Sequence, residues 1–284
     1  MLVSLKAVLD MADARGAAVG SFNITSFECI QAVLGAAEER NEPVILQFAQ
    51  VHESIVPLSV IGPVMVLMGE SAKVPVCVHL DHGEDLQHVK QALEMGFTSV
   101  MYDGSVLPYA QNVANTRTAV EMAREYDASV EAEIGAMGRE EFGSVGAAGE
   151  AVNSTYTDPA AARDFVEKTG IDALACSFGT VHGLYLKAPK LDFERISAIR
   201  AQIGVPIVMH GGSGISDGDF KKCIDRGVRK INFYTYMAKA GGADVQKKCA
   251  EAKDIVYFHD ITLWGTASMK QQVLHAMQVF ANQG

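Results

Sequence analysis

The stretch Val76-Cys77-Val78-His79-Leu80-Asp81-His82-Gly83 decides which fold this chain can adopt. Its apolar first half, preceded by Pro75, is typical of a buried strand. Its second half carries two histidines and an aspartate, which are costly to bury unless they have partners. Such a conflict between local pattern and chemistry is expected at functional sites. The end of this strand is therefore the first candidate site.

Similar stretches recur along the chain and alternate with helical patterns. The other expected strands cover residues 17–23, 43–49, 99–103, 128–135, 172–179, 205–210 and 229–235. Near-continuous apolar strands indicate a parallel sheet covered on both faces. Eight strand–helix units in 284 residues predict a (β/α)8 TIM barrel, with an extra N-terminal helix at 2–14 and C-terminal helices, clearest at 271–280. A doubly wound open sheet is the alternative, but no glycine-rich dinucleotide fingerprint follows the first strand.

Composition and charge fit a globular protein and exclude several partners. The chain is 49% hydrophobic and has a net charge of −10. A barrel of this length folds as one unit, so we expect a single domain over residues 1–284. Lys and Arg residues form no cluster, which argues against a nucleic-acid partner. The most apolar long stretch, 55–68, is too short and too interrupted by proline and glycine to cross a membrane.

The cysteines indicate the cellular compartment. Five cysteines are scattered without a CxxC pair, and several lie in apolar runs. We expect reduced, buried thiols in a cytoplasmic protein. The N-terminus also lacks the apolar core of a signal peptide.

Polar residues gather at the expected carboxyl ends of the strands, which converge on the functional face of a TIM barrel. These residues are Asn23, Asp81, His82, Asp103, Glu133, His182, His210 and Asn232. Three histidines from three strands form a good catalytic zinc set, because zinc takes imidazole nitrogen and three ligands leave one position open. Asp103 and Glu133 either form a second metal position or orient the histidines.

A glycine-rich turn follows the seventh expected strand. Gly211, Gly212, Ser213 and Gly214 allow a backbone to approach an anion closely, and Ser216 then opens a helix. Barrels often bind phosphate in the loops after strands seven and eight, and residues Asn232, Phe233, Tyr234 and Thr235 would complete such a site. The alternative is that the glycines only form a tight turn.

Two further basic residues lie on the third and eighth expected strands. His79 lies on the same face as Asp81, where it either supports the site or is an ordinary hydrogen-bonded barrel histidine. Lys230 begins the eighth expected strand, at the opposite face of the barrel, so a Schiff-base mechanism lacks its nucleophile.

Five motifs in order along the chain resemble the class II, zinc-dependent ketose-bisphosphate aldolases, which include fructose- and tagatose-bisphosphate aldolases. The motifs are His79-Leu80-Asp81-His82-Gly83, Val130-Glu131-Ala132-Glu133-Ile134-Gly135, Gly179-Thr180-Val181-His182-Gly183, His210-Gly211-Gly212-Ser213-Gly214 and Lys230-Ile231-Asn232. The resemblance implies a lyase that cleaves a phosphorylated ketose to dihydroxyacetone phosphate and an aldehyde through a zinc-stabilised enediolate. It also implies a homodimer or homotetramer.

The resemblance assigns roles by position. His82, His182 and His210 would hold zinc, with Asp103 and Glu133 as the alternative metal position. Asp81 would move the proton of the C4 hydroxyl, and Glu141, on the long loop at 136–157, would shuttle the C3 proton. The dihydroxyacetone phosphate half would be bound by Gly183, Gly211, Gly212, Ser213, Asn232, Phe233, Tyr234 and Thr235, and Asn23 is also expected to bind substrate.

The chain departs from the family pattern where the aldehyde half would bind. Ala49 replaces a common serine, Phe233-Tyr234 adds bulk on the eighth strand, and residues 254–262 replace an Asp-Pro-Arg before the last helix. These changes predict that the aldehyde half is not glyceraldehyde 3-phosphate or is bound differently. Two other function classes stay open, a non-catalytic sugar-phosphate-binding barrel and a metal-dependent hydrolase.

Overall fold

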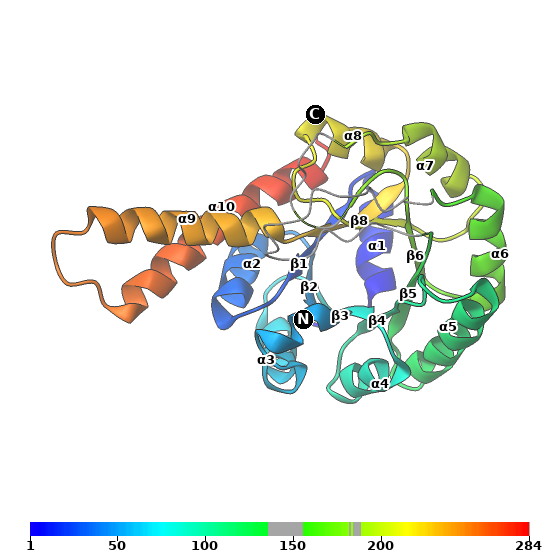
Figure 1. The fold of residues 1–284 in the computed structure, drawn as a ribbon, viewed down its shortest axis with the longest axis horizontal. Coiled ribbons are helices and arrows are strands. Elements are labelled where there is room, and N and C mark those ends of the chain that lie inside the picture. Colours follow the sequence, from blue (N-terminus) through cyan, green and yellow to red (C-terminus); the bar gives the residue numbers. More distant parts are fainter. Residues whose placement is uncertain (136–155, 182, 184–188, 284) are drawn as a thin grey trace.

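A computed structural model describes residues 1–135, 156–181, 183 and 189–283. Its strands close into one parallel barrel in the order β1 to β8, so the TIM-barrel prediction is confirmed and the open sheet is wrong (Figure 1). The strands are β1 Val19–Asn23, β2 Val44–Ala49, β3 Val76–Gly83, β4 Ser99–Tyr102, β5 Ser129–Ile134, β6 Ala173–Cys176, β7 Ile207–Met209 and β8 Val228–Phe233.

Helices surround the barrel and connect its strands. The α-helices are α1 Leu5–Asp13, α2 Phe27–Arg40, α3 Leu58–Ser71, α4 Leu86–Glu94, α5 Tyr109–Arg124, α6 Pro159–Thr169, α7 Phe193–Arg200, α8 Asp217–Asp225, α9 Thr235–Glu251 and α10 Phe258–Phe280, and the short 3-10 helix η1 spans Gln50–Ser54. Several begin at the expected caps; Asp158, for example, accepts a hydrogen bond from the Ala161 amide, and Pro159 follows it. No helix in the described ranges has the length and apolar character needed to cross a bilayer.

The barrel interior has an apolar lower part and a polar upper part. Helix α1 closes the amino-terminal end, because its buried face packs against inward side chains of the strands. That cluster contains Leu5, Val8, Leu9, Ala12, Val19, Ile45, Cys77, Met101, Ala173, Ala175 and Val208. Above it the inward side chains become charged or polar. The second, larger apolar cluster lies between the strands and the surrounding helices.

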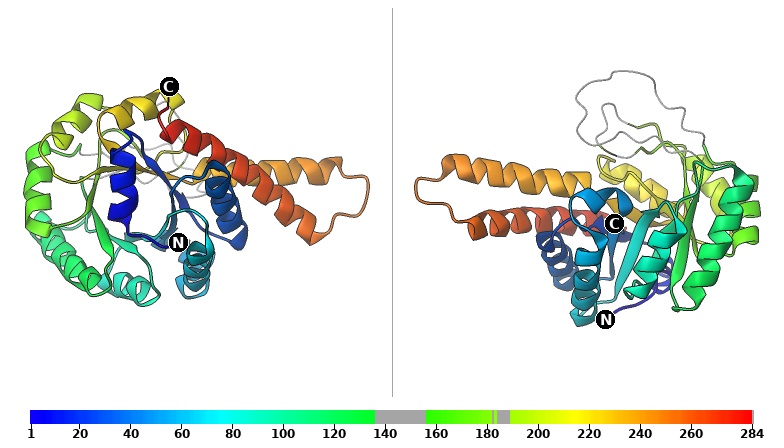
Figure 2. Two further views of the ribbon diagram at one scale, coloured as in Figure 1. Left: turned by 180° about the vertical axis from the view of Figure 1, so that it is seen from behind. Right: turned by 60° about the horizontal axis from the view of Figure 1, so that its bottom comes forward.

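The C-terminal helices are longer than the sequence pattern predicts. The eighth strand ends at Phe233 rather than residue 235, and Thr235 is already the first residue of α9. Helices α9 and α10 extend from the barrel as an antiparallel pair, which we call the arm (Figures 1 and 2). None of residues 242–268 is buried. This outer part of the arm therefore shares none of the barrel's core, whereas the barrel-proximal ends of both helices pack into it.

Candidate active site

The end of β3 has an unusual backbone that brings two neighbouring side chains to the same site. His82 has a φ of 48°, in the left-handed region. The pairing of β3 with β4 shifts register between Leu80 and Gly83, which marks a bulge. Successive strand residues normally point to opposite faces. The bulge and the left-handed residue thus allow Asp81 and His82 both to reach the carboxyl-end opening of the barrel.

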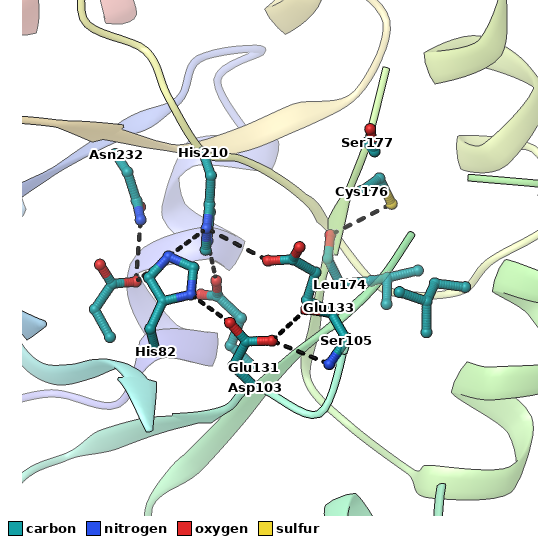
Figure 3. Close-up of polar contacts among 12 residues, drawn as sticks. His82, Asp103, Ser105, Glu131, Glu133, Leu174, Cys176, Ser177, His210 and Asn232 are labelled. Carbon is teal, nitrogen blue, oxygen red and sulfur yellow. Dashed lines mark hydrogen bonds and ion pairs between the residues drawn. The ribbon is translucent and has the colours of Figure 1, made fainter. Parts of the chain in front are cut away.

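His82 is held by a carboxylate on one side and meets a second histidine on the other (Figure 3). Its Nδ1 lies 2.7 Å from Asp103 Oδ2. Asp103 in turn accepts hydrogen bonds from the Ser105 hydroxyl at 2.6 Å and the Ser105 amide at 3.1 Å. His82 Nε2 lies 3.1 Å from His210 Nδ1. Asp103 therefore orients His82 so that its Nε2 faces His210.

His210 follows β7 directly and is fully buried. Its Nε2 lies 2.8 Å from Glu131 Oε1, and its Nδ1 lies 3.7 Å from Glu133 Oε2. Both glutamates come from β5, and they flank the imidazole as Figure 3 shows. Hydrogen bonding to Glu131 places the ring proton on Nε2, which leaves the Nδ1 lone pair toward His82.

The donor atoms at this point fit a divalent metal. Ligand atoms of Asp81, His82 and His210 lie within 4.8 Å of one another, as do those of His82, Asp103 and Glu133. In a tetrahedral zinc site with Zn–N bonds of about 2.05 Å, two ligand nitrogens are about 3.3 Å apart. The 3.1 Å between His82 Nε2 and His210 Nδ1 agrees with that separation. The nitrogen donors and the carboxylates behind them are typical of zinc sites.

The site is strongly charged and asymmetric. Burial alone would lower the pKa of His82, but the Asp81 and Asp103 carboxylates raise it to about 10. Burial, with the charge of His82, lowers the pKa of His210 well below its usual value. Burial, with the charge of Asp103, raises the pKa of Glu133 well above its usual value. The protonated His82 is therefore the cation among these carboxylates, a position that a bound metal ion could take instead.

Asp81 is buried at the end of β3 and is held from β8. The Asn232 side-chain amide donates a hydrogen bond to Asp81 Oδ1 at 3.1 Å. Asp81 Oδ1 also lies 4.0 Å from His82 Nε2. Burial would raise the pKa of Asp81, but His82 and His210 lower it overall. Asn232 was expected to bind substrate, and the structure shows that its amide orients the carboxylate beside the two histidines.

The glycine-rich loop after β7 lies against the start of α9. Ser213 Oγ accepts hydrogen bonds from the Tyr234 amide at 3.2 Å and the Tyr236 amide at 3.4 Å. The Gly212 amide donates to the Asn232 carbonyl at 3.0 Å, so it is not available to an anion in this arrangement. The side chain of Tyr234, the N-cap residue of α9, does not cap the amides of the first turn, and the helix dipole there favours negative charge.

Helix α8, by contrast, begins with a capped first turn that carries negative charge. Its N-cap Ser216 accepts from the Asp219 amide at 3.2 Å, and Asp217 and Asp219 place negative charge in the first turn. The sequence placed the helix after Ser216 next to the phosphate loop. The structure places the start of α9 against the glycine-rich loop instead.

Phe233 and Tyr234, two other residues predicted to bind substrate, have side chains on different sides of the barrel wall. The Phe233 side chain points outward and packs edge-to-face against Phe22, with ring centroids 6.2 Å apart. Tyr234 lies near the opening: its hydroxyl is 3.3 Å from Thr25 Oγ1, and its ring centroid is 4.9 Å from that of the buried His52. Phe233 therefore cannot offer its side chain to a ligand in the barrel.

Asn23 ends β1 close to the opening and is nearly buried. Its Oδ1 accepts a hydrogen bond from Gln47 Nε2 at 2.6 Å, and Gln47 also contacts the Ser21 hydroxyl. Gln47 was not recognised from the sequence. Its position two residues before Ala49 on β2 was the available signal.

Two charged residues lie below the site. Glu131 was not singled out from the sequence, and Lys230 was expected at the other end of the barrel. Glu131 lies two residues before Glu133 on β5, and this spacing puts both on the inner face. Lys230 was expected at the opposite face of the barrel, and this is wrong: its Nζ is fully buried in the interior, 2.8 Å from Glu131 Oε2. Strand β8 begins at Val228, so Lys230 lies inside the strand and shares the inner face with Asn232, two residues later. His182 and Glu141 lie outside the described residues.

Sequence comparisons identify relatives of this chain. A sequence model of the family described as "Fructose-bisphosphate aldolase class-II" matches residues 3–284. A Staphylococcus aureus (strain Mu50) protein named "Fructose-bisphosphate aldolase" is 43% identical over 257 residues, covering 89% of this chain and 88% of that protein. A Bacillus subtilis (strain 168) protein named "Probable fructose-bisphosphate aldolase" is 40% identical over 256 residues, with the same two coverages, 89% and 88%.

Solved structures with a similar fold are also named aldolases. The YdjI aldolase from Escherichia coli K12 is similar with a TM-score of 0.87 and 31% identity, covering 100% of this chain and 99% of that one. A fructose-bisphosphate aldolase from Campylobacter jejuni shares the fold, with a TM-score of 0.75, 23% identity, and coverage of 98% and 95%. The family match and the relatives at 40–43% identity favour a lyase over a hydrolase or a non-catalytic barrel. The chain belongs to the class II fructose-bisphosphate aldolase family and is a carbon–carbon lyase.

Proposed function

We propose that this protein is a zinc-dependent aldolase that reversibly cleaves a phosphorylated ketose into dihydroxyacetone phosphate and an aldehyde. The observation that carries the proposal is the 3.1 Å approach of His82 Nε2 to His210 Nδ1 beside the Asp81 carboxylate. These histidines would hold the zinc, with His182 as the third ligand expected from the sequence. Bound zinc supplies the positive charge that polarises the ketone and favours carbon–carbon cleavage.

Asp81 is the proposed acid–base group at the C4 hydroxyl. A general acid–base residue needs a fixed position within hydrogen-bond reach of its proton, and the hydrogen bond from Asn232 supports that position. The depressed pKa of Asp81 means that the group starts as a carboxylate, ready to accept the proton. The role of Glu141 at the C3 proton rests on the family resemblance alone.

The phosphate of the dihydroxyacetone half is proposed to bind between the loop after β7 and the start of α9. Both lone pairs of Ser213 Oγ are used by backbone amides, so its hydroxyl proton is left to donate to an anion. Gly211 has a φ of 66° and allows the backbone to approach a ligand closely. Gly183 and Thr235 are proposed to complete the site.

The aldehyde half is proposed to lack a phosphate, which makes a ketose 1-phosphate the better substrate class. Ala49 is aligned with Asp81 across β2 and β3 and offers no polar group. Tyr234 packs on His52 beside it. The pKa of His52 is lowered, mainly by burial, so this histidine is neutral and supplies no charge for a second phosphate.

Retro-aldol rates test the proposal. Purified protein with a measured zinc content is assayed on ketose 1-phosphates beside fructose and tagatose bisphosphates. We expect one catalytic zinc per chain and turnover of at least one ketose 1-phosphate. Turnover of a bisphosphate alone would contradict the proposed aldehyde half, and absence of bound metal would contradict the zinc mechanism.

We also propose a homodimer or homotetramer and a cytoplasmic location. The arm supports the first proposal, because Ile255, Tyr257 and Phe258 near its tip are 78%, 59% and 79% exposed. The outer part of the arm, residues 242–268, has no buried residue and gains little stability from its own packing. Four of the five cysteines are buried as free thiols, and Cys249 is exposed, which suits a reducing compartment.

A further inference from the structure

A buried layer of charged side chains lies directly beneath the candidate active site. Lys230, Glu131 and His79 have no exposed surface. Each precedes by two residues, on its own strand, a member of the upper layer: Asn232, Glu133 and Asp81 respectively. Since side chains two residues apart share a face of a strand, the same three strands build both layers.

The charges of this layer form one tight ion pair. Lys230 Nζ lies 2.8 Å from Glu131 Oε2. Burying either charge alone would be strongly unfavourable, and removing one partner of a buried pair leaves the other uncompensated. A pair of this kind seldom adds stability over apolar residues of equal size. Its presence therefore calls for an explanation other than stability.

The same carboxylate reaches the metal-site histidine. Glu131 Oε1 lies 2.8 Å from His210 Nε2, while Oε2 faces Lys230. One carboxylate thus connects the ammonium group to the imidazole. Because Glu131 accepts a hydrogen bond from Nε2–H, the Nδ1 lone pair of His210 points at His82 Nε2, 3.1 Å away.

His79 closes the layer from the third side as a neutral group. Its Nδ1 lies 2.9 Å from Ser99 Oγ. Its Nε2 lies 3.4 Å from Lys230 Nζ and 3.5 Å from Glu131 Oε2. Burial, together with the nearby Lys230 charge, lowers the pKa of His79 well below its usual value. Lys230 is therefore the one cation that the geometry places against Glu131 within the described residues.

We propose that Lys230 and Glu131 are positioning residues that fix the tautomer and orientation of His210 and thereby set the zinc affinity of the site. The inference rests on the proposed zinc-dependent function. The Lys230 ammonium group supplies the positive charge that balances the Glu131 carboxylate. It thereby holds that carboxylate between Lys230 and the His210 imidazole. Glu131 holds the imidazole so that Nδ1 is the metal-binding nitrogen.

The test compares single and paired substitutions that keep the side-chain volume. Glu131→Gln and Lys230→Met each leave an unbalanced buried group, whereas the double variant removes both charges together. Zinc affinity is measured by competition with a chromophoric chelator, and the site geometry by the visible spectrum of the cobalt-loaded protein. Thermal midpoints are recorded for every variant. Partners that orient a metal-bound histidine typically change metal affinity about 10- to 100-fold.

We expect both single variants to lose thermal stability and to bind zinc about 10- to 100-fold more weakly. The double variant regains stability, because it leaves no lone buried charge, but keeps the weakened zinc binding and the altered cobalt spectrum. Leu9→Ala in α1 is the control, since it removes fully buried apolar volume from the cluster at the amino-terminal end of the barrel and leaves the charged groups of this layer in place. It lowers the thermal midpoint and leaves zinc affinity unchanged.

A metal-independent readout completes the experiment. Nitrogen-15 spectra of the histidines are recorded on the metal-free protein, and the His210 signals are assigned with His210→Asn. In the wild type, His210 should carry its proton on Nε2. In the double variant, the ratio of the Nε2-protonated to the Nδ1-protonated form should change. Wild-type zinc affinity with an unchanged tautomer in the double variant would overturn this inference. A wild-type protein that binds no zinc would instead contradict the proposed function.

Discussion

At the residue scale, His82 shows how the chain places two catalytic candidates next to each other in sequence. A left-handed backbone is unfavourable for a residue with a side chain, by about 1–3 kcal/mol. Here it turns His82 back toward the interior, beside Asp81, where a regular strand would send the two side chains to opposite faces. The hydrogen bond of His82 Nδ1 to Asp103 fixes the ring in that orientation. Local strain thus coincides with the site.

Substitution of Asp81 separates metal binding from cleavage. We expect Asp81→Ala to keep bound zinc and to lose cleavage activity by about 10²- to 10⁴-fold, the usual contribution of a general acid–base group. His210→Ala should lose both metal and activity, because it removes a proposed ligand. Metal analysis and a retro-aldol assay on the same samples measure both effects. Retained cleavage in Asp81→Ala would refute the role given to that residue.

At the element scale, the loop after β7 depends on a glycine that has no room for a side chain. Gly211 has a φ of 66°, and a Cβ there would overlap the Val181 carbonyl oxygen. Gly212 is similarly confined, since its Cβ would lie 2.7 Å from the Asn232 carbonyl oxygen. The loop therefore packs against the segment after β6 and against β8. Both contacts hold it beside the start of α9.

Gly211→Ala tests this confinement. We expect a loss of about 1–3 kcal/mol in unfolding free energy from backbone strain, together with a raised KM for the phosphorylated ketose. Gly218→Ala is the matched control, because nothing lies within 4 Å of its added Cβ and it is in helix α8. That control should be neutral or slightly stabilising, by up to about 1 kcal/mol. Denaturant unfolding and steady-state kinetics supply the two readouts, and equal behaviour of the two variants would contradict the predicted crowding.

Helix α1 closes the barrel from below and should act on stability alone. Leu9 is fully buried among the inward side chains of the strands. Leu9→Ala is expected to reduce the unfolding free energy by about 2–5 kcal/mol, because it leaves a cavity. At temperatures where the variant is folded, its retro-aldol rate should equal that of the wild type. A specific loss of turnover without a loss of stability would show that α1 affects the site directly.

At the scale of the whole molecule, the arm departs furthest from a compact barrel. Its first helix starts directly after Tyr234 at the opening, and its second packs back along α2, where Lys270 pairs with Glu39 at 2.7 Å (Figure 2). The middle of the arm has no buried residue, yet apolar side chains lie near its tip. A surface of this kind is typical of contacts between protein chains.

Charged residues at the arm tip should therefore weaken self-association. We expect the wild type to sediment as a dimer or tetramer and the double variant Ile255→Asp/Phe258→Glu to dissociate toward the monomer at equal concentration. Leu67→Glu, at a residue 61% exposed on α3, is the control and should keep the wild-type mass. Sedimentation velocity measures all three. An unchanged mass in the arm variant would exclude the tip as an interface.

The sequence by itself was sufficient for the barrel and for much of the opening. Alternating apolar strands and helices leave few packings that bury both faces of a parallel sheet, so eight units imply closure. His82, His210, Asp81, Asp103 and Glu133 could be assigned to one face, because the ends of parallel strands converge there. Periodicity and motif spacing carry this information directly.

Only the tertiary structure decided which of the assigned residues contact one another and which side chains face the opening. It showed Asp103 bonded to His82, Asn232 bonded to Asp81, and Phe233 facing away from the opening. It also moved Lys230 from the far end of the barrel to an ion pair with Glu131. These side-chain contacts join strands that are far apart in sequence. They depend on the register between strands and on the bulge between Leu80 and Gly83 in β3. A one-residue change in pairing register sends every side chain of a strand to the other face, and sequence patterns locate strand ends only to within a few residues.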